Sequence, residues 1–449
     1  MYIQQSINGD SLTPISIFHR LPGSHHFLLE SSLKHEKSGR YSFIGSEPTK
    51  SYRGEKGKLT ITSLQTGERQ ELSGDAMTLL KQHLPAPLSP SPFPFSTGAI
   101  GYVGYEVLGH NEPTGKTLTK DRTLPDLYFL WYPTIVVYDH QSHTVTVLNS
   151  EGNQSEVERV VKALQTYPDT ELPDEAASLS FTSSVTEAHF LKQVDQVKEW
   201  IRQGEIFQLV LSQRLSATID QKPFAYYRKL RRVNPSPYMF YIDFDDAVVL
   251  GASPESFIRV ADGKLQTNPI AGTRPRGKTD AEDIQHAESL KNDPKERAEH
   301  DMLVDLARND VGKLSVPGTV KVTKYQDIER YQHVMHLVSE VEGTLREDVH
   351  PLDAFTACLP AGTVSGAPKI RAMQLINELE DVQRGVYAGA VGYLSAGGNL
   401  DAALAIRTAV ISDGLIDIQA GAGIVYDSVP LSEYQETLHK AKSLLEVFQ

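Results

Sequence analysis

The chain of 449 residues contains one cysteine, Cys358, which excludes an internal disulfide framework and a cysteine-rich zinc site. Its setting, Ala357-Cys358-Leu359, is typical of a small buried side chain rather than a nucleophile. No run of basic residues is longer than Arg231-Arg232 and the net charge is −13, so we expect no binding to nucleic acid. The most apolar window, residues 127–138, is about a dozen residues long, too short to cross a bilayer. With no leader-like N-terminus, the sequence favours a cytoplasmic protein that binds no membrane.

An acidic segment rich in serine and proline divides the chain into two unequal regions. Residues 166–184 read TYPDTELPDEAASLSFTSS and have no sustained apolar period, which is typical of a linker. We therefore predict a strand-rich N-terminal region over residues 1–165 and a second region over residues 185–449.

Helical and strand patterns alternate after the linker, and this mixture favours an α+β fold with large sheets. We expect helices over residues 190–203, 223–233, 294–310 and 368–380 and from about residue 430. We expect strands over residues 206–215, 247–252, 388–394, 402–411 and 416–420.

The helix expected over residues 294–310 has carboxylates on its apolar face. At about 100° per residue, one arc of roughly 80° holds two acidic and two apolar residues: Glu296, Glu299, Leu303 and Leu306. The other charged residues of this helix fall on the opposite side. Because a buried carboxylate costs several kcal/mol unless it is paired or binds a metal, this placement needs a partner.

The last helix repeats the pattern, with Glu433 and Glu436 on the arc that also carries Lys440 and Leu444. Two Glu-x-x-Glu pairs that both face inward suggest one shared cation. Oxygen ligands without nearby cysteine or histidine favour Mg²⁺ over zinc. The alternative is that both pairs make only local salt bridges.

Several other features are compatible with an acidic small-molecule ligand. The turns at residues 361–369 and 421–423 offer backbone amides that could bind an anion, although each signal is weak alone and a plain helix entry is the simpler explanation of the first. Arg407 lies in an apolar strand-like run, where it needs either a structural ion pair or a substrate carboxylate. His333 and His336 lie three apart on a helix-like stretch, where packing is a simpler explanation than zinc binding.

These motifs, in this order, resemble those of the chorismate-utilising enzymes. The resemblance is strongest from about residue 190 to residue 448 and looser in the first 150 residues, through HHFLLESS, GRYSFIG and GAIGYVGYE. The matching segments in the second region are GEIFQLVLSQR, NPSPYMF, GASPES, NPIAGTRPRG, AEHDMLVDLARND, YQHVMHLVSEVEG, LPAGTVSGAPKIRAM, YAGAVGYL, AIRTAV and QAGAGIVYDSVPLSEYQET.

The resemblance implies an α+β fold with two stacked antiparallel sheets and outer helices. It also implies Mg²⁺ as cofactor, with Glu299 and Glu436 as direct ligands and Glu296 and Glu433 holding it through water. Glu255 would protonate the departing hydroxyl of chorismate, for which it must stay protonated near neutral pH, and His336 would serve the later loss of pyruvate. The remaining implied site residues are Thr363, Lys440, Gln208, Gly272, Thr273, Tyr387, Arg407, Gly421, Ala422 and Gly423, with Tyr387 and Arg407 on the enolpyruvyl carboxylate.

Three positions favour the anthranilate-forming branch of this family. Gln208 stands where water-adding relatives have a lysine base, and Ala271 where many aminodeoxychorismate synthases have a lysine nucleophile. Val210 replaces an asparagine common in that second group. Ammonia would then attack chorismate directly, giving 2-amino-2-deoxyisochorismate and then anthranilate and pyruvate. Aminodeoxychorismate formation, for folate synthesis, remains the alternative.

The resemblance further implies a partner and an inhibitor. No glutamine amidotransferase is fused to this sequence, so ammonia would come from a separate subunit in a hetero-oligomer. Glu30, Ser31, Pro237, Tyr238 and Met239 match a tryptophan feedback site, although they could simply pack the two regions together. A non-catalytic subunit that binds chorismate or tryptophan is a further alternative, which the retained acidic site residues disfavour.

Overall fold

The computed structural model of the chain describes residues 2–31, 39–86, 88, 93–110, 112–166, 178–220, 223–331 and 334–448. Most of the predicted linker and His333 lie outside these residues. No helix in the described ranges is long and apolar enough to cross a membrane.

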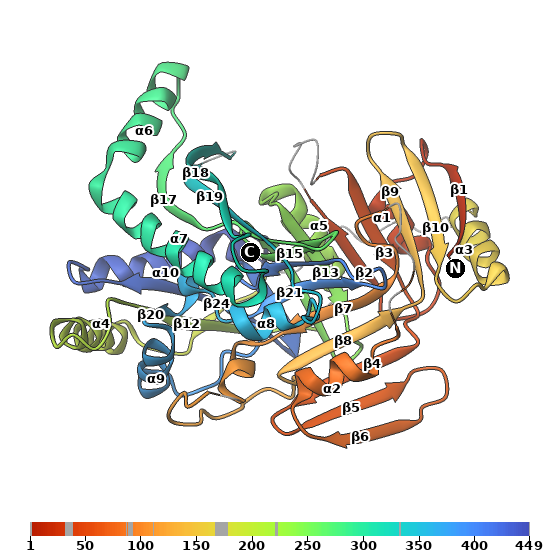
Figure 1. Cartoon of the computed structure of the whole chain (residues 1–449), viewed down its shortest axis with the longest axis horizontal. Helices are drawn as coiled ribbons and strands as arrows, with labels where there is room; N and C mark the ends of the chain where they lie inside the picture. The colour runs from red at the N-terminus through yellow and green to blue at the C-terminus, as the bar shows by residue number, and fades with distance from the viewer. Residues whose placement is uncertain are drawn as a thin grey trace.

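Two large antiparallel sheets dominate the fold, which confirms the predicted α+β class with a two-sheet core (Figure 1). Among the described residues each sheet has twelve strands. The first runs in the order β1 (Ile3–Asn8), β10 (Thr144–Asn149), β9 (Thr134–Asp139), β3 (Tyr41–Gly45), β2 (Phe27–Glu30), β13 (Tyr238–Asp243), β14 (Ala247–Ser253), β23 (Thr408–Ser412), β24 (Leu415–Ile424), β12 (Gln208–Thr218) and β11 (Thr182–Ser183), with β20 (Gly366–Ala367) also pairing with β12.

The second sheet contains the strands that carry His336 and Gly272. Its order is β17 (Ile270–Pro275), β19 (Val334–Thr344), β16 (Lys264–Thr267), β15 (Ser256–Ala261), β22 (Leu400–Leu404), β21 (Ala390–Ser395), β7 (Gly98–Val103), β8 (Leu127–Tyr132), β4 (Lys50–Glu55), β5 (Lys58–Ser63) and β6 (Arg69–Ser73), with β18 (Lys321–Arg330) paired to β19. Both sheets take strands from residues 1–165 and from residues 185–449. The two regions are therefore joined through shared sheets, and their boundary stays a prediction.

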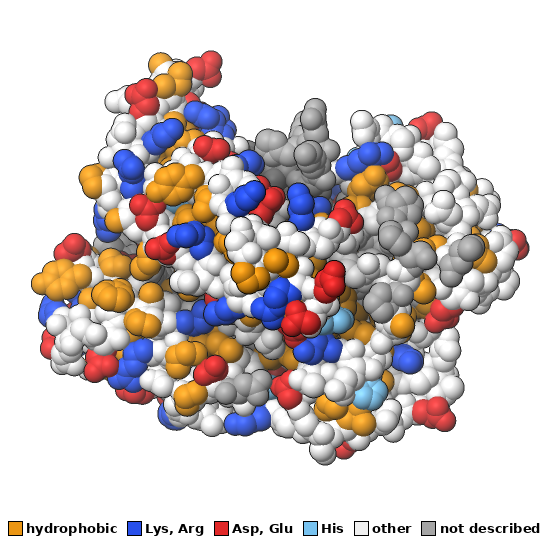
Figure 2. All heavy atoms as spheres, in the orientation of Figure 1, with side chains coloured by type: hydrophobic (Ala, Val, Ile, Leu, Met, Phe, Trp, Pro, Cys, Tyr) orange, Lys and Arg blue, Asp and Glu red, His pale blue; other side chains and the backbone are white. Residues whose placement is uncertain are grey.

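Helices cover the outer faces of the sheets, and α6 projects at one end of the molecule (Figure 1). They are α1 (Pro14–Arg20), α2 (Ala76–His83), α3 (Gln154–Gln165), α4 (Glu187–Arg202), α5 (Phe224–Val233), α6 (Asp280–Asn292), α7 (Pro294–Leu314), α8 (Asp353–Cys358), α9 (Lys369–Leu379) and α10 (Pro430–Phe448), with 3₁₀ turns η1 (Tyr105–His110) and η2 (Gly362–Val364). Acidic and basic side chains are interspersed over the face in Figure 2.

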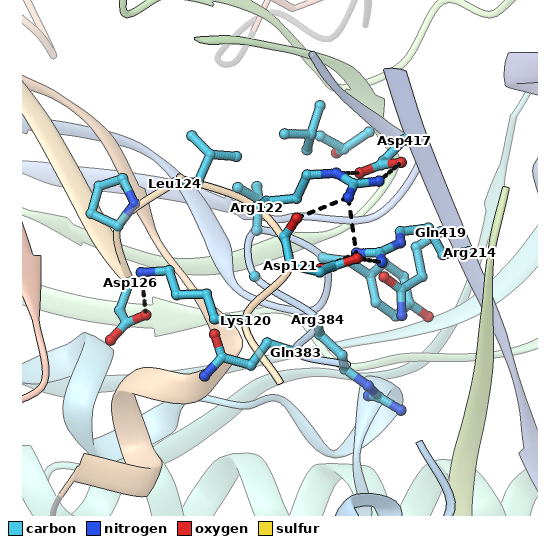
Figure 3. Close-up of a pocket in the computed structure, with 16 residues that line it drawn as sticks. Lys120, Asp121, Arg122, Leu124, Asp126, Arg214, Gln383, Arg384, Asp417 and Gln419 are labelled. Atoms are coloured by element: carbon cyan, nitrogen blue, oxygen red, sulfur yellow. Dashed lines mark hydrogen bonds and ion pairs between the residues drawn. The ribbon is translucent and has the colours of Figure 1, made fainter. Parts of the chain in front are cut away.

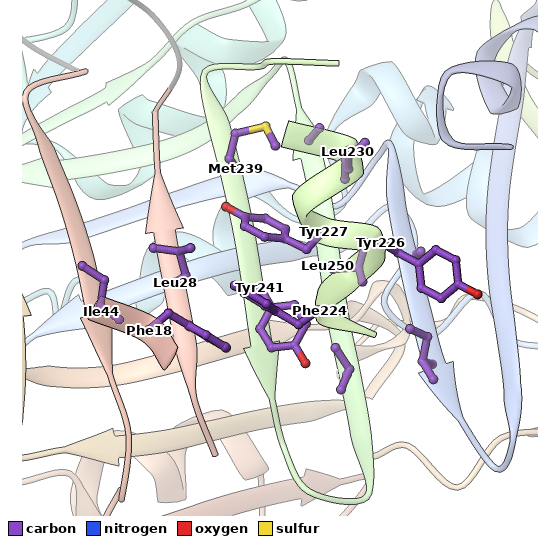
Figure 4. Close-up of a cluster of buried hydrophobic side chains, with 14 of the residues drawn as sticks. Phe18, Leu28, Ile44, Phe224, Tyr226, Tyr227, Leu230, Met239, Tyr241 and Leu250 are labelled. Carbon is purple, nitrogen blue, oxygen red and sulfur yellow. The ribbon is translucent and has the colours of Figure 1, made fainter. Parts of the chain in front are cut away.

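The core lies both between the sheets and beneath the helices. Aromatic residues of the two sheets meet between them, where the rings of Phe43 and Tyr393 lie 6.0 Å apart. On the other face of the first sheet, α1 and α5 pack through Phe18 and Phe224, whose rings stack at 3.8 Å (Figure 4). Cys358 is buried at the end of α8, and burial raises the pKa of its thiol to about 12. This confirms the prediction of a packing role.

Three local predictions were wrong. The single strand expected over residues 402–411 is two strands, β22 and β23, because the chain leaves the second sheet after Leu404 and enters the first at Thr408. Arg407 lies in that crossing with φ of +51°. His336 lies in strand β19 rather than on a helix, and residues 421–423 lie inside β24 rather than in a turn.

Candidate active site

Two chain crossings between the sheets lie side by side, and they carry Glu255 and Arg407. The first joins β14 to β15 and the second joins β22 to β23. The Leu404 amide donates to the Glu255 carbonyl at 3.0 Å, and the Ala252 amide donates to the Arg407 carbonyl at 3.0 Å. The Ser253 hydroxyl adds a buried bond of 2.7 Å to the Leu404 carbonyl. These bonds fix the two charged side chains relative to each other.

The Glu255 carboxyl is held in a desolvated position beside η2. The Thr363 hydroxyl donates to its Oε1 atom at 3.0 Å. Desolvation raises the pKa of Glu255 to about 7, against the opposing effects of the Thr363 hydrogen bond and the Lys440 charge. A carboxyl with this pKa is partly protonated at neutral pH, as a general acid must be.

His336 lies on β19 opposite Thr273 of β17. Its Nδ1 atom is 2.9 Å from the Gly272 carbonyl oxygen and 3.1 Å from the Thr273 hydroxyl. Desolvation lowers the pKa of His336, which favours the neutral ring. Since a carbonyl only accepts, Nδ1 carries the proton and Nε2 is left as a basic nitrogen.

Gly272 brings this strand close to α7. Its φ is +73°, and a Cβ atom there would lie 2.9 Å from Oε2 of Glu296. Both facts favour glycine at this position. The backbone next to His336 is therefore in contact with the predicted acidic cluster.

Four glutamates from α7 and α10 form the acidic part of the site. Desolvation is the main cause that raises the pKa of Glu299, and the charges of Glu296 and Glu436 add to it. Desolvation and the charge of Glu436 likewise raise the pKa of Glu433. The two helix pairs thus lie within electrostatic range of each other, as predicted.

The helix-face prediction was wrong for Glu436 and correct for its three partners. Glu296, Glu299 and Glu433 are half-buried, whereas the Glu436 side chain is 46% exposed. Glu436 lies one turn before Lys440 and pairs with it at 2.7 Å. Within the described ranges, no three acidic, histidine or cysteine side chains are close enough to hold a metal ion on their own.

The local salt-bridge alternative holds for half of the cluster. Arg274 pairs with Glu296 at 3.0 Å and with Asp293 at 2.9 Å, in addition to the Glu436–Lys440 pair. In the part of the chain that the structure describes, Glu299 and Glu433 have no ion-pair partner. These two carboxylates therefore leave negative charge available for a cation.

One edge of β24 borders the same space. The Lys440 ammonium donates to the Gly421 carbonyl at 3.1 Å, while Ala422 pairs with Leu211 of β12. Because the polar groups of alternate residues point to opposite edges of a strand, the amides of Gly421 and Gly423 point away from β12. A Cβ atom on Gly423 would lie 2.7 Å from Nε2 of Gln208.

Tyr387 and Arg407 complete the polar lining. A Cβ atom on Gly421 would lie 2.8 Å from the Tyr387 hydroxyl. Arg407 donates to the Lys440 carbonyl and, at 2.8 Å, to the Ser443 hydroxyl. It has no carboxylate partner among the described residues, and desolvation lowers its pKa. A structural ion pair with a described carboxylate therefore does not explain this guanidinium, and its binding to a ligand carboxylate stays a prediction.

The five residues predicted for a tryptophan site also come together. Met239 of β13 pairs with Glu30 of β2, so the neighbouring Tyr238 lies next to Ser31 and Pro237 follows at the strand start. The Glu30 carboxylate accepts from Tyr227 at 3.0 Å and pairs with Arg231 at 2.8 Å. The buried Ser31 hydroxyl has no hydrogen-bond partner among the described residues.

Sequence reasoning missed a buried arginine that supports this site. Arg384 precedes β21, and its side chain is fully buried beside Glu380. Figure 3 shows it at the edge of a small cavity that Arg122, Asp417 and Gln419 also line. In the sequence Arg384 stands in Gln-Arg-Gly, a polar tripeptide that is typical of an exposed turn, so no pattern distinguished it.

Comparison with known proteins decides the family. The sequence matches chorismate binding enzymes over residues 24–446. The chain belongs to the chorismate binding enzyme family. As a member of this family it is an enzyme that uses chorismate, and the family's two-sheet fold is the one described above.

Members of the family that are about 40% identical to this chain are named as component 1 of anthranilate synthase. Anthranilate synthase component 1 of Lactococcus lactis is 43% identical over 99% of both chains, and that of Aquifex aeolicus is 43% identical over 98% of this chain and 93% of its own. The crystal structure of anthranilate synthase component I from Streptococcus pneumoniae matches with a TM-score of 0.84 at 41% identity, covering 98% of each chain. An isochorismate synthase of Escherichia coli, at 21% identity and a TM-score of 0.73, shares the fold.

Proposed function

We propose that the chain converts chorismate and ammonia to anthranilate and pyruvate, as the chorismate-binding component of an anthranilate synthase. The observation that carries this proposal is the convergence on one space of a partly protonated carboxyl, an arginine without a carboxylate partner and two glutamates without an ion-pair partner among the described residues. Chorismate presents two carboxylates and a leaving hydroxyl, and each has a complementary group here. The relatives that are about 40% identical over the whole chain support the same reaction.

The donor set at α7 and α10 fits Mg²⁺. Glu299 and Glu436 would hold the ion directly, with Glu296 and Glu433 reaching it through water. Two carboxylates suffice because Mg²⁺ commonly keeps several waters and completes its shell with a substrate oxygen. When bound, the ion would neutralise the ring carboxylate of chorismate. This also accounts for a cluster in which two glutamates lack an ion-pair partner within the described ranges.

The protein groups would then divide the chemistry. Arg407 and Tyr387 would hold the enolpyruvyl carboxylate, and the amides of Gly421 and Gly423 the ring carboxylate. The protonated Glu255 would donate its proton to the C4 hydroxyl as it leaves as water while ammonia bonds to C2.

Five further residues have supporting roles in this proposal. Thr363 and Lys440 keep the Glu255 carboxyl in place, and Gln208 lines the side from which ammonia approaches. Gly272 and Thr273 hold the His336 ring, whose free Nε2 atom is placed to accept the C2 proton as pyruvate leaves and the ring becomes aromatic.

The proposal includes a partner and a feedback inhibitor. Ammonia would be supplied in the cytoplasm by a glutamine amidotransferase subunit. Tryptophan would bind between β2 and β13, where Glu30 and the Ser31 hydroxyl, which has no partner among the described residues, offer acceptors for its ammonium group. Pro237, Tyr238 and Met239 would line the rest of that site.

The first test is a product assay. The purified chain is incubated with chorismate, Mg²⁺ and excess ammonium at mildly alkaline pH, and products are separated by chromatography. Anthranilate and pyruvate in equal amounts, dependent on Mg²⁺ and absent in Glu436→Gln, would support the proposal. Aminodeoxychorismate would assign the chain to the folate branch, and chorismate binding without turnover would indicate a binding subunit.

A further inference from the structure

We infer that Arg384 is a positioning residue for the chorismate site, and that Glu106 and Tyr105 of the N-terminal region hold it in place. The kinetic test of this inference rests on the proposed function. The binding test requires only that the chain binds chorismate. The buried Arg384 guanidinium contacts three separate segments of the site.

The Arg384 guanidinium uses four of its five N–H donors in hydrogen bonds. It donates to both carboxylate oxygens of Glu380, at 2.8 and 2.6 Å. It also donates to the Val364 carbonyl at 2.8 Å and to the Val210 carbonyl at 2.8 Å. The fork geometry of arginine allows all four bonds at once, which lysine cannot do.

Both carbonyl acceptors belong to segments that carry a site residue. Val364 directly follows Thr363, the hydrogen-bond donor to Glu255. Val210 lies on β12 opposite Gly423 and two residues after Gln208. The Tyr387 ring lies 5.6 Å from the guanidinium. Arg384 therefore fixes the positions of a general acid, a backbone anion site and a substrate-binding tyrosine together.

The Glu380 carboxylate also connects Arg384 to strand β24, through Ser212 of β12. Oε1 of Glu380 accepts the Ser212 amide at 3.2 Å and the Ser212 hydroxyl at 2.7 Å. The Gln419 side chain donates to that hydroxyl at 2.8 Å. The pair β12 and β24, whose edge lines the site, is thus anchored to the Arg384–Glu380 ion pair.

Two residues of the N-terminal region also contact Arg384. Glu106 of η1 accepts the amides of Arg384 and Gly385 at 2.7 and 3.1 Å. The guanidinium lies 4.7 Å from the Tyr105 ring, in cation–π contact. η1 therefore determines where the Arg384 backbone and side chain lie. It follows that the N-terminal region has a role in catalysis besides the proposed regulation.

The test compares four variants of the full chain. Arg384→Gln removes the guanidinium group. Glu106→Ala removes the two oxygens that accept the Arg384 and Gly385 amides, and Glu106→Gln keeps one of them as a carbonyl oxygen. Arg159→Gln is the matched control, because Arg159 has a similar two-bond pair with Glu156 within α3 but touches none of the site segments. Chorismate affinity is measured by calorimetry with Mg²⁺, kcat and KM by anthranilate formation, and folding by thermal melting.

We expect Arg384→Gln to lower kcat/KM by about 10- to 100-fold, with a rise in both KM and the Kd for chorismate. Glu106→Ala should show a smaller loss that Glu106→Gln partly restores, and Arg159→Gln should keep the parent constants within about twofold. A purely structural role would reduce the melting temperature or the active fraction but leave KM and Kd at the parent values, and this result would overturn the inference. If the parent chain binds chorismate without forming anthranilate, the proposed function fails while the binding comparison still decides the role of Arg384.

Discussion

The Thr363 hydroxyl donates a hydrogen bond of 3.0 Å to Oε1 of Glu255. The bond stabilises the carboxylate form and so opposes the desolvation that raises the pKa of Glu255 to about 7. If the protonated form is required for turnover, kcat is high below this pKa and falls as the pH rises through it. The hydrogen bond therefore lowers the highest pH at which the enzyme keeps its activity.

Thr363→Val should extend activity to higher pH. Loss of the hydrogen bond removes a contribution that lowers the Glu255 pKa, so the falling limb of the kcat profile should move up by about one pH unit. The measurement is kcat against pH from about 6 to 9 at saturating chorismate. An unshifted limb would show that Glu255 is not the group that titrates.

Glu255→Gln should separate binding from chemistry. The amide keeps the shape and a hydrogen-bond acceptor for Thr363 but cannot give a proton to the leaving hydroxyl. We expect kcat to fall by about 100-fold or more, with chorismate affinity within about threefold of the parent by calorimetry. Comparable losses of binding and turnover would instead make Glu255 a binding residue.

Glu299→Gln should raise the Mg²⁺ concentration needed for half-maximal activity by about 10-fold or more, because it removes a carboxylate that has no ion-pair partner in the described protein. Asp305→Asn on the same helix is the matched control, since its side chain is 72% exposed and pairs with Arg308. A metal titration of both variants checks the prediction. Equal requirements in the two would argue against a metal ligand at position 299.

The sequence predicted the acidic cluster better than the strand connections around it. Periodicity placed Glu296, Glu299 and Glu433 correctly because a helix face depends on spacing alone. It could not show that Glu436 is exposed, since exposure depends on how far the neighbouring elements cover the end of α10. Residues 402–411 read as one strand because both halves are apolar, and only the pairing of each half with a different sheet reveals the break.

The contacts that position the site could not be predicted from local patterns. Arg384 and Glu106 are 278 residues apart. Arg384 stands in a short polar stretch that resembles an exposed turn, and Glu106 stands alone between Tyr105 and Val107, with no pattern that indicates a distant partner. Their burial results from the meeting of η1 with the segment before β21, which is a property of the tertiary fold. The family motifs identified the groups assigned to the substrate, but not the residues that hold those groups.

Arg407→Met should reduce activity without reducing stability. Arg407 is desolvated, its pKa is lowered by burial, and it has no carboxylate partner among the described residues, so its replacement relieves a cost of burying charge. We expect kcat/KM for chorismate to fall by about 10- to 100-fold, the value of a charge-assisted hydrogen bond to a carboxylate. The melting temperature should stay within about 2 °C of the parent value or rise. A marked loss of thermal stability would indicate a structural arginine instead.

Tyr238→Phe should weaken tryptophan inhibition more than catalysis. The Tyr238 hydroxyl donates to the buried Asp401 at 3.1 Å, which connects β13 beside the proposed tryptophan site to β22. That strand leads directly into the crossing that carries Arg407, so a ligand that moves Tyr238 has a short path to the substrate carboxylate. We expect the inhibition constant for tryptophan to rise by about 5- to 100-fold, within the usual range of coupling between sites. Without tryptophan, kcat should change by less than about twofold.

Tyr52→Phe, which loses a similar bond to the His83 carbonyl far from this path, should leave inhibition unchanged. An equal response of the two variants would show that Tyr238 does not connect the sites.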